Sequence, residues 1–130
     1  RFSWETIMAV VELETANFEQ TIQDHDFVIV DFWAPWCGPC RSFAPIYDKV
    51  SEDFGDILFA KVDTEAHQAI AGHFQIRSIP TLMIFREQII IFSQAGALPE
   101  GALRELLAKA SELDMADVKR QIAGQASNQA

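Results

Sequence analysis

The chemistry that this chain can perform centres on two cysteines separated by two residues. Cys37 and Cys40 are its only cysteines, and they stand in the string Trp36-Cys37-Gly38-Pro39-Cys40. The string follows an apolar segment and precedes one with helical periodicity, so it is expected at the N-terminus of a helix. Unpaired backbone donors and the positive end of the helix dipole lie there, and both stabilise a thiolate over a thiol. The pattern therefore predicts a redox-active pair.

The spacing also gives each sulfur a role. Cys37, at the tip of the helix, is expected to be the exposed nucleophile that attacks a disulfide in another protein. Cys40 lies one turn further in and is expected to be the resolving thiol, which attacks Cys37 and releases the reduced substrate. A disulfide between them closes a very small loop, so it stabilises the fold little and can form and break as a functional event.

The alternative chemistry for such a pair is half of a zinc site. Two more ligands would be needed, and the histidines of the chain are His25, His67 and His73. His67 and His73 have the loose end of zinc-finger spacing, but 26 residues separate Cys40 from His67, about twice the usual gap. The sequence therefore favours redox chemistry over metal binding, and we expect no metal.

Asp31 is the one charged residue in Phe27–Trp33, an otherwise apolar segment. A buried carboxylate without a partner prefers its neutral form, so Asp31 is expected to have a raised pKa and to exchange a proton with Cys40. Ordinary solvation at the end of a strand is the alternative for this residue. Lys61, on a neighbouring predicted strand, either pairs with Asp31 or is an exposed lysine, and the sequence leaves both open.

Composition narrows the classes of partner. The 130 residues carry 10 basic and 19 acidic side chains, a net charge of −9, which disfavours nucleic acid and anionic membrane surfaces. No apolar run approaches the about 20 residues that a membrane span needs. The N-terminal residues lack the apolar core of a secretory signal, so we expect a cytoplasmic protein that does not associate with membranes.

Alternating apolar segments place the cysteine string within an α/β fold. Five segments have the composition of strands: Met8–Leu13, Phe27–Trp33, Ile57–Asp63, Thr81–Phe85 and Ile89–Ser93. Four have helical spacing: one that Thr15 caps, one from the cysteine string to about Phe54, Glu65–Phe74, and one beginning at Pro99. The first three strands are joined by helices and are expected to be parallel, whereas the last two form a hairpin. The result is a mixed sheet with helices on both faces.

The C-terminal stretch continues beyond the last of these helices. We divide the chain into a leader (1–7), a catalytic domain (8–113) and a C-terminal extension (114–130). Met115, Val118 and Ile122 fall on one face of a helix that Asp114 can cap. This extension is either a packed or frayed tail or, less favoured by its composition, a helix that binds a partner or a second copy.

Several motifs together resemble the thioredoxin family. They occur in the order and spacing of that family and cover roughly residues 8 to 112: Val30–Cys40 around the cysteine pair, Lys61-Val62-Asp63, Ile76–Thr81, and Gln94–Ala97. A lone Cys-x-x-Cys is a weak signal, but the cysteine string together with the downstream Ile79-Pro80-Thr81 is a specific one. The resemblance implies the thioredoxin fold, with a central mixed five-stranded sheet.

The resemblance also implies a substrate-binding surface. Pro80 corresponds to the cis-proline that faces the disulfide in this family. Around it, the resemblance implies an apolar surface for the extended backbone of a substrate, made by Trp36, Gly38, Pro39, Ile79, Pro80, Gly96 and Ala97. For Ile79 and Ala97, ordinary core packing is the alternative. Glu87-Gln88 departs from the Asn-Gly common at the hairpin tip, so we expect a different loop type there.

Activity and partners follow from the same resemblance. Gly38 and Pro39 between the cysteines resemble the reducing members, which implies a protein disulfide reductase acting on disulfide-containing proteins. The implied electron donor is a thioredoxin reductase, with no cofactor beyond the redox disulfide, and the implied state is a monomer. Two alternatives stay open: a thiol oxidase or isomerase of an oxidising compartment, and a binding or chaperone module whose thiols matter little.

Overall fold

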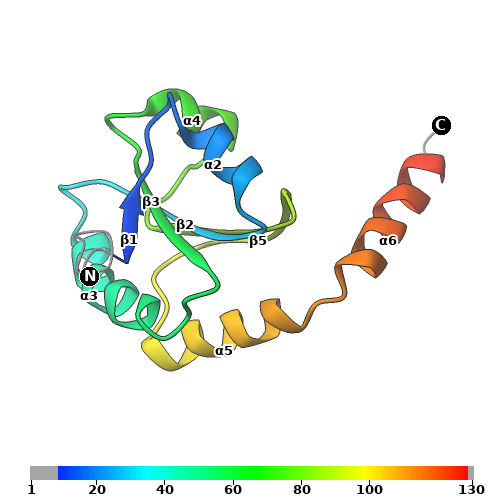
Figure 1. The fold of residues 1–130 in the computed structure, drawn as a ribbon. Coiled ribbons are helices and arrows are strands. Elements are labelled where there is room, and N and C mark those ends of the chain that lie inside the picture. The colour runs from blue at the N-terminus through cyan, green and yellow to red at the C-terminus, as the bar shows by residue number, and fades with distance from the viewer. Residues whose placement is uncertain (1–8, 129–130) are drawn as a thin grey trace, which may run out of the picture.

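A computed structural model describes residues 9–128, with side chains to residue 125 (Figure 1). Five strands form one sheet: β1 (Val10–Glu12), β2 (Phe27–Trp33), β3 (Leu58–Asp63), β4 (Thr81–Arg86) and β5 (Ile89–Ala95). The helices are α2 (Phe18–Asp24), α3 (Gly38–Ser51), α4 (Gln68–His73), α5 (Glu100–Glu112) and α6 (Met115–Asn128). No helix within the described range is long and apolar enough to cross a membrane.

The sheet is mixed, as predicted. Its strand order is β1-β3-β2-β4-β5, with β3 parallel to both β1 and β2. β4 pairs antiparallel with both β2 and β5. Helices α2 and α4 cover one face and helices α3 and α5 the other (Figure 1). This arrangement confirms the expected thioredoxin fold.

Strand β2 lies at the centre of the sheet and divides the core into two halves. Val28, Val30 and Phe32 point into the core under α2 and α4. Ile29, which lies between them along the strand, points into the core under α3 and α5. Because side chains alternate along a strand, Asp31 shares the face of Ile29. The register of β2 thus places the single carboxylate of the strand beneath the helix that begins at the cysteines.

The prediction that Thr15 caps the first helix is wrong. Helix α2 begins at Phe18, with Asn17 at the cap position. The Asn17 side chain instead accepts a hydrogen bond from the Glu14 backbone N–H at 2.8 Å, which closes the turn before the helix. Thr15 lies in that turn, and its hydroxyl lies 3.2 Å from Nδ1 of His67. The hydroxyl therefore links the turn to the segment before α4.

The hairpin between β4 and β5 also differs from the prediction. Glu87 and Gln88 both have positive φ, 51° and 67°, which is the geometry of the two-residue type I′ turn usually formed by Asn-Gly. Here the turn is formed by Glu-Gln, and contacts with distant parts of the chain stabilise it. The Glu87 backbone N–H donates to the Asp26 carbonyl at 2.7 Å, and Nε2 of Gln88 donates to the Ile22 carbonyl at 3.2 Å.

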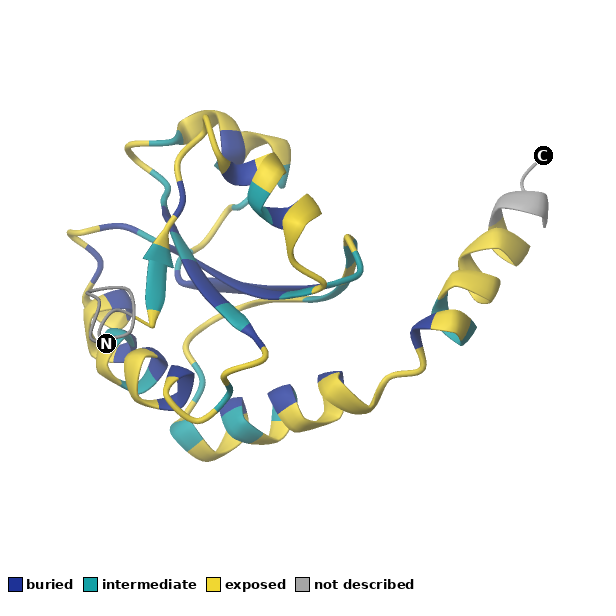
Figure 2. Cartoon of the chain, viewed as in Figure 1, coloured by how far each residue is buried: buried dark blue, intermediate teal, exposed yellow. Residues whose placement is uncertain are grey.

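The predictions for the two ends of the chain concern a leader and a C-terminal helix. The expected leader, residues 1–7, lies outside the described residues. At the other end, α6 starts after Asp114, whose Oδ1 accepts a hydrogen bond from the Asp117 backbone N–H at 3.1 Å. This is the predicted cap. Figure 2 shows that α6 is buried at Met115 and exposed along most of its remaining length.

Candidate active site

Cys37 and Cys40 are joined by a disulfide at the N-terminus of α3. Their Cα atoms lie 5.2 Å apart. Cys37 occupies the N-cap position, and its Sγ accepts a hydrogen bond from the Cys40 backbone N–H at 3.2 Å. Pro39 lies in the first turn, where proline is tolerated because its nitrogen would be unpaired in any case. The helix N-terminus thus directs a backbone donor at the first sulfur, as the thiolate argument requires.

The expectation of an exposed Cys37 is wrong for the disulfide form. Cys37 is 4% exposed and Cys40 3%, so burial does not distinguish them. Ile79 and Trp33 pack against the disulfide, and Sγ of Cys37 lies 3.8 Å from the Ile79 carbonyl oxygen. What distinguishes Cys37 is its cap position and the backbone donor of Cys40, not its accessibility in this state.

Asp31 is buried close to Cys40. Its exposed fraction is 3%, and Oδ1 has no hydrogen-bond partner among the described residues. Burial raises the pKa of Asp31 from 3.8 to about 7, with the positive charge of Lys61 acting in the opposite direction. A cavity of about 60 Å³ is lined by Asp31, Cys40 and Lys61 among others, which is enough space for a water molecule. The carboxyl of Asp31 and the second cysteine therefore line the same small cavity.

Lys61 lies beside Asp31 without forming an ion pair. The two residues are register partners on β2 and β3, both are described in full, and no ion pair joins their side chains within 4 Å. Instead, Nζ of Lys61 lies 4.7 Å from the centre of the Trp33 ring, a cation–π geometry. Lys61 thus affects Asp31 through its charge and forms no ion pair with it. It is also not the exposed lysine that the sequence allowed as the alternative, because it is half-buried against Trp33.

Three further residues support the site and were not predicted from the sequence: Glu65, Arg41 and Tyr47. Nε1 of Trp36 donates a hydrogen bond to Oε2 of Glu65, and Nη1 of Arg41 donates to the Pro35 carbonyl at 2.9 Å. The Tyr47 hydroxyl donates to the Ala60 carbonyl at 2.7 Å beneath the cavity, and burial raises the pKa of this phenol. No local pattern marks Glu65, since it lies 29 positions after Trp36 in the chain.

The surface expected to receive substrate assembles from separate loops. The Ile79–Pro80 peptide bond is cis, as the resemblance implied. The Gly96 backbone N–H donates to the Pro80 carbonyl at 2.7 Å and so joins the loop after β5 to the proline. Gly96 has φ of 107°, a conformation that favours glycine. Trp36 is 65% exposed beside the disulfide.

Most of the other residues predicted for this surface are accessible, but the Pro80 side chain is buried. Gly38, Pro39, Gly96 and Ala97 are exposed, and Ile79 is half-buried. Ordinary core packing, the alternative for both residues, does not describe the exposed Ala97, whereas Ile79 packs in part against the buried disulfide. Within the described residues, no group of three or more His, Cys, Asp or Glu side chains is arranged to hold a metal ion.

Comparison with known proteins identifies the family. The family model described as thioredoxin matches residues 9–109, most of the chain. The chain belongs to the thioredoxin family. A curated member, "Putative thioredoxin 2" of Streptomyces coelicolor, is 52% identical over 117 residues, which cover 90% of this chain and 87% of that protein. The thioredoxin of Porphyra purpurea is 41% identical over 104 residues, 78% of this chain and 97% of that protein.

Solved thioredoxin structures have the same fold. A mutant thioredoxin from Halobacterium salinarum superposes with a TM-score of 0.74 at 30% identity, covering 81% of this chain and 93% of that chain. Plasmodium falciparum thioredoxin gives 0.71 at 32% identity, covering 76% and 96%. As a member of the thioredoxin family with a Cys37–Cys40 disulfide, the chain is a thiol–disulfide oxidoreductase.

Proposed function

We propose that this thioredoxin-family protein is a protein disulfide reductase in which Cys37 is the nucleophile and Cys40 the resolving thiol. The observation that carries the proposal is the hydrogen bond from the Cys40 backbone N–H to Sγ of Cys37 at the start of α3. In the dithiol form, this donor and the helix dipole stabilise a thiolate on Cys37 in preference to one on Cys40.

The reaction proceeds in two exchanges. The Cys37 thiolate attacks one sulfur of a substrate disulfide, so a Cys37–substrate bond forms, the substrate S–S bond breaks, and the departing substrate thiolate takes a proton from water. Cys40 then loses its proton and attacks Sγ of Cys37. The Cys37–Cys40 bond forms and the second substrate thiolate leaves. The substrate gains two electrons, and the two cysteines are oxidised to the disulfide.

Asp31 is proposed to accept the proton of Cys40 in the second step. Support comes from its burial beside the shared cavity and from a pKa of about 7, close to the value that a base needs near neutral pH. Lys61 and Tyr47 are proposed as positioning residues that fix the charge and shape of this cavity. The backbone of the substrate is proposed to bind the surface made by Trp36, Ile79, Pro80, Gly96 and Ala97.

The cysteine roles are tested by trapping. Wild-type protein is expected to speed the reduction of insulin by dithiothreitol. Cys40→Ser is expected to accumulate mixed disulfides with insulin through Cys37, whereas the matched Cys37→Ser variant accumulates none. If neither variant traps insulin and the wild type does not speed its reduction, the reductase proposal is wrong.

The reduction potential separates a reductase from a thiol oxidase or isomerase. We expect equilibration with glutathione to give a potential on the reducing side of the glutathione pool. The residues between the cysteines support this direction, because Gly38 and Pro39 supply no charge that would stabilise the thiolate and hence the reduced form. A potential near that of oxidising relatives would favour the thiol oxidase or isomerase.

The other alternative is a binding or chaperone module whose thiols matter little. If the protein is such a module, the double variant Cys37→Ser, Cys40→Ser is expected to retain full function in the host.

Electron donor, location and cofactor requirement complete the proposal. The reaction uses two sulfurs and one carboxyl group, so we propose that it needs neither a metal nor an organic cofactor. The proposed donor is a thioredoxin reductase and the proposed location is the cytoplasm. Reduction of the Cys37–Cys40 disulfide by a purified thioredoxin reductase tests the donor. Dialysis against a chelator is expected to leave insulin reduction unchanged.

A further inference from the structure

An apolar hollow lies next to the surface that is proposed to receive substrate. It has a volume of about 230 Å³ and is lined by strand β5, helix α5 and the loop between them. Three half-buried side chains supply its apolar part: Phe92, Leu98 and Leu106. All three also pack against the core under α3 and α5, so the hollow has a fixed floor. The exchange reactions at the cysteines assign no role to it.

The hollow and the substrate surface share one loop. Gln94 and Leu98, which line the hollow, flank Gly96 and Ala97 in the sequence. Gly96 and Ala97 belong to the surface proposed to receive substrate, and the Gly96 backbone N–H donates to the Pro80 carbonyl at 2.7 Å. The loop after β5 therefore connects the disulfide site directly to one end of the hollow.

Strand β5 is an edge strand, so an extended polypeptide can lie beside it. Within the described sheet, it pairs with β4 on one side and with no strand on the other. The strand, Ile89–Ala95, contains no charged residue and no proline, the usual means of keeping an edge strand unpaired. Its register with β4 is interrupted between Ile90 and Phe92, and it is regular from Phe92 onward, beside the hollow. A segment added to this edge places alternate side chains on the face of the hollow.

The hollow lies only a few residues of extended chain from the reacting sulfur. Sγ of Cys37 lies 3.8 Å from the Ile79 carbonyl oxygen. Gly96 lies across from Pro80, at about 5 Å, the usual spacing of neighbouring strands. The strand from Gly96 back to Phe92 spans about 13 Å. A substrate therefore needs about four or five extended residues beyond its cysteine to place a side chain in the hollow.

The lining of the hollow favours an apolar side chain as the occupant. Its charged residues among those described are Glu105 and Lys109, which form an ion pair with each other at 3.1 Å. A charged ligand would have to compete with that pair. The volume is below the about 300–1,000 Å³ typical of pockets for drug-sized molecules, which favours one large side chain of a polypeptide over a separate small molecule.

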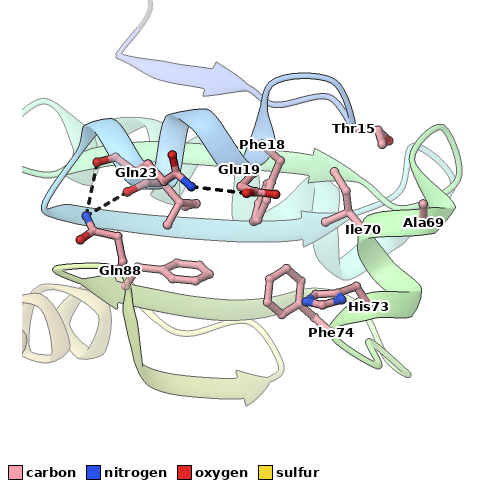
Figure 3. Close-up of a pocket in the computed structure, with 11 residues that line it drawn as sticks. Thr15, Phe18, Glu19, Gln23, Ala69, Ile70, His73, Phe74 and Gln88 are labelled. Atoms are coloured by element: carbon pink, nitrogen blue, oxygen red, sulfur yellow. Dashed lines mark hydrogen bonds between the residues drawn. The ribbon is translucent and has the colours of Figure 1, made fainter. Parts of the chain in front are cut away.

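A larger apolar groove, of about 450 Å³, does not have this continuity with the disulfide site. It lies between α2 and α4, where Figure 3 shows Phe18, Ile70 and Phe74 in the groove and Ala69 beside them. Its floor belongs to the half of the core on the face away from α5. None of the described residues that line it belongs to the disulfide site or to the loop after β5. It therefore carries no inference about substrate.

We propose that the hollow between β5 and α5 is a substrate subsite, which binds a large apolar or aromatic side chain about four or five residues from the cysteine under attack. The substrate segment crosses the loop at Gly96 and Ala97 and adds to the free edge of β5. Backbone hydrogen bonds then hold the segment, and the hollow selects the side chain. This inference rests on the proposed reductase function and names the class of substrate that it prefers: proteins with an extended apolar segment next to the reducible cysteine.

A series of peptides tests the subsite. Each peptide has one cysteine in a mixed disulfide with a chromogenic aromatic thiol, and a phenylalanine replaces serine at one of the successive positions on either side of that cysteine. The measurement is the second-order rate constant with which reduced protein releases the aromatic thiol. Phenylalanine about four or five residues from the cysteine is expected to raise this constant about ten-fold over the all-serine peptide, the lower end of the gain from burying such a side chain, because the hollow is open.

Two substitutions of Ala102 close the hollow. Ala102 is exposed on α5 and lines the hollow. Ala102→Phe occupies the space, and Ala102→Glu introduces a charge that a bound phenylalanine would desolvate. Both are expected to remove most of the preference for phenylalanine. Both are expected to leave the rate constant for the all-serine peptide unchanged, because Ala102 is not part of the disulfide site.

Matched controls make the same changes outside the hollow. Ala108 is exposed on α5 without lining the hollow, and Ala69 is exposed in the groove of Figure 3. Ala108→Phe, Ala108→Glu and Ala69→Glu are expected to keep the full preference. Circular dichroism of all variants is expected to match the wild type, because every substituted position is exposed.

The possible results separate the subsite from the reductase function. Equal rate constants for every peptide overturn the subsite and leave the reductase function standing, whereas release of the thiol from none of the peptides overturns the reductase function itself. A preference that neither Ala102→Phe nor Ala102→Glu reduces also overturns the subsite. Sedimentation of the wild type in dithiothreitol is expected to give a monomer. A dimer that Ala102→Glu dissociates would place a second copy in the hollow and overturn the proposal.

Discussion

At the scale of single residues, the site depends on a carboxyl group kept away from water. Asp31 lies on the central strand β2, which is buried on both faces, with Lys61 near it but not bonded to it. Because burial raises the pKa of Asp31 to about 7, the folded protein binds this proton more tightly than the unfolded chain does. The contribution of Asp31 to the free energy of unfolding must then fall as pH rises.

This dependence gives a prediction for Asp31→Asn. A rise from 3.8 to about 7 corresponds to about 4 kcal/mol of stability that is present below pH 4 and lost by the time pH exceeds 7. The free energy of unfolding of the variant, relative to wild type, is therefore expected to rise by about that amount from acid to alkaline pH. Urea unfolding across this range measures it. Asp56→Asn, at an exposed carboxylate that does not line the cavity beside Asp31, is the control, and parallel curves for wild type and Asp31→Asn would contradict the prediction.

Glu65 gives a second prediction at this scale. Its carboxylate accepts the Trp36 indole N–H and so orients a side chain that is largely exposed next to the disulfide. Glu65→Ala is expected to slow insulin reduction about five-fold, the equivalent of a hydrogen bond worth about 1 kcal/mol. Reduction of a small aromatic disulfide, which does not need the surface around Trp36, is expected to change little.

The control for this variant is Glu52→Ala, which removes an exposed carboxylate at the end of α3, far along the helix from the disulfide. Equal slowing of insulin and of the small disulfide would show that Glu65 acts on the cysteines and does not act by orienting Trp36.

At the scale of elements, the β4–β5 hairpin connects parts of the chain that are distant in sequence. Gln88 donates to the end of α2, Glu87 pairs with α6, and Arg86 donates to the end of α5. The last contact, from Nη1 of Arg86 to the Ala110 carbonyl at 2.6 Å, supplies a partner for a carbonyl in the last turn of α5. The hairpin is therefore a structural junction as well as a part of the sheet.

Arg86→Met tests this junction. Methionine keeps an apolar stem but removes the charged donor, so the free energy of unfolding is expected to fall by about 1.5–3 kcal/mol, the usual range for hydrogen bonds from charged groups. Chemical denaturation monitored by far-UV circular dichroism measures the change. The exposed Arg77→Met is the control and is expected to change stability by less than about 0.5 kcal/mol. Equal effects of the two substitutions would contradict a capping role for Arg86.

At the scale of the whole molecule, the residues of the active site and those of the C-terminal helix α6 belong to different parts of the chain. The residues around the disulfide come from β2, α3 and the loops before β4 and after β5. Among the residues that the structure describes, none from α6 lines the cavity beside Asp31. The division of the chain after Leu113 stays a prediction, and a truncated chain tests it.

A chain ending at Leu113 is expected to reduce insulin at the wild-type rate. Its free energy of unfolding is expected to fall by about 2 kcal/mol, the usual contribution of one buried methionine, because Met115 is lost. Denaturation and insulin assays on the same preparation measure both. Loss of insulin reduction in a folded truncated chain would show that α6 takes part in catalysis.

Much of the site could be predicted from the sequence because it is encoded locally. The cysteine pair, the proline in the first turn and the apolar strand before them are contiguous, so their spacing alone places a redox pair at the start of a helix. The same holds for Asp31, since one charge within a buried strand is visible without coordinates. The alternation of strand and helix patterns likewise determined the mixed sheet.

Only the tertiary structure decided the contacts between distant segments. Glu65 reaches Trp36, and Gly96 bonds to Pro80, through pairings that leave no periodic trace in the sequence. The hairpin type was mispredicted for the same reason, because contacts from Asp26 and Ile22 stabilise a turn that its own residues disfavour. Local propensity and spacing act over a few residues. The shape of a groove and the burial of a sulfur depend on which surfaces the folded chain brings together.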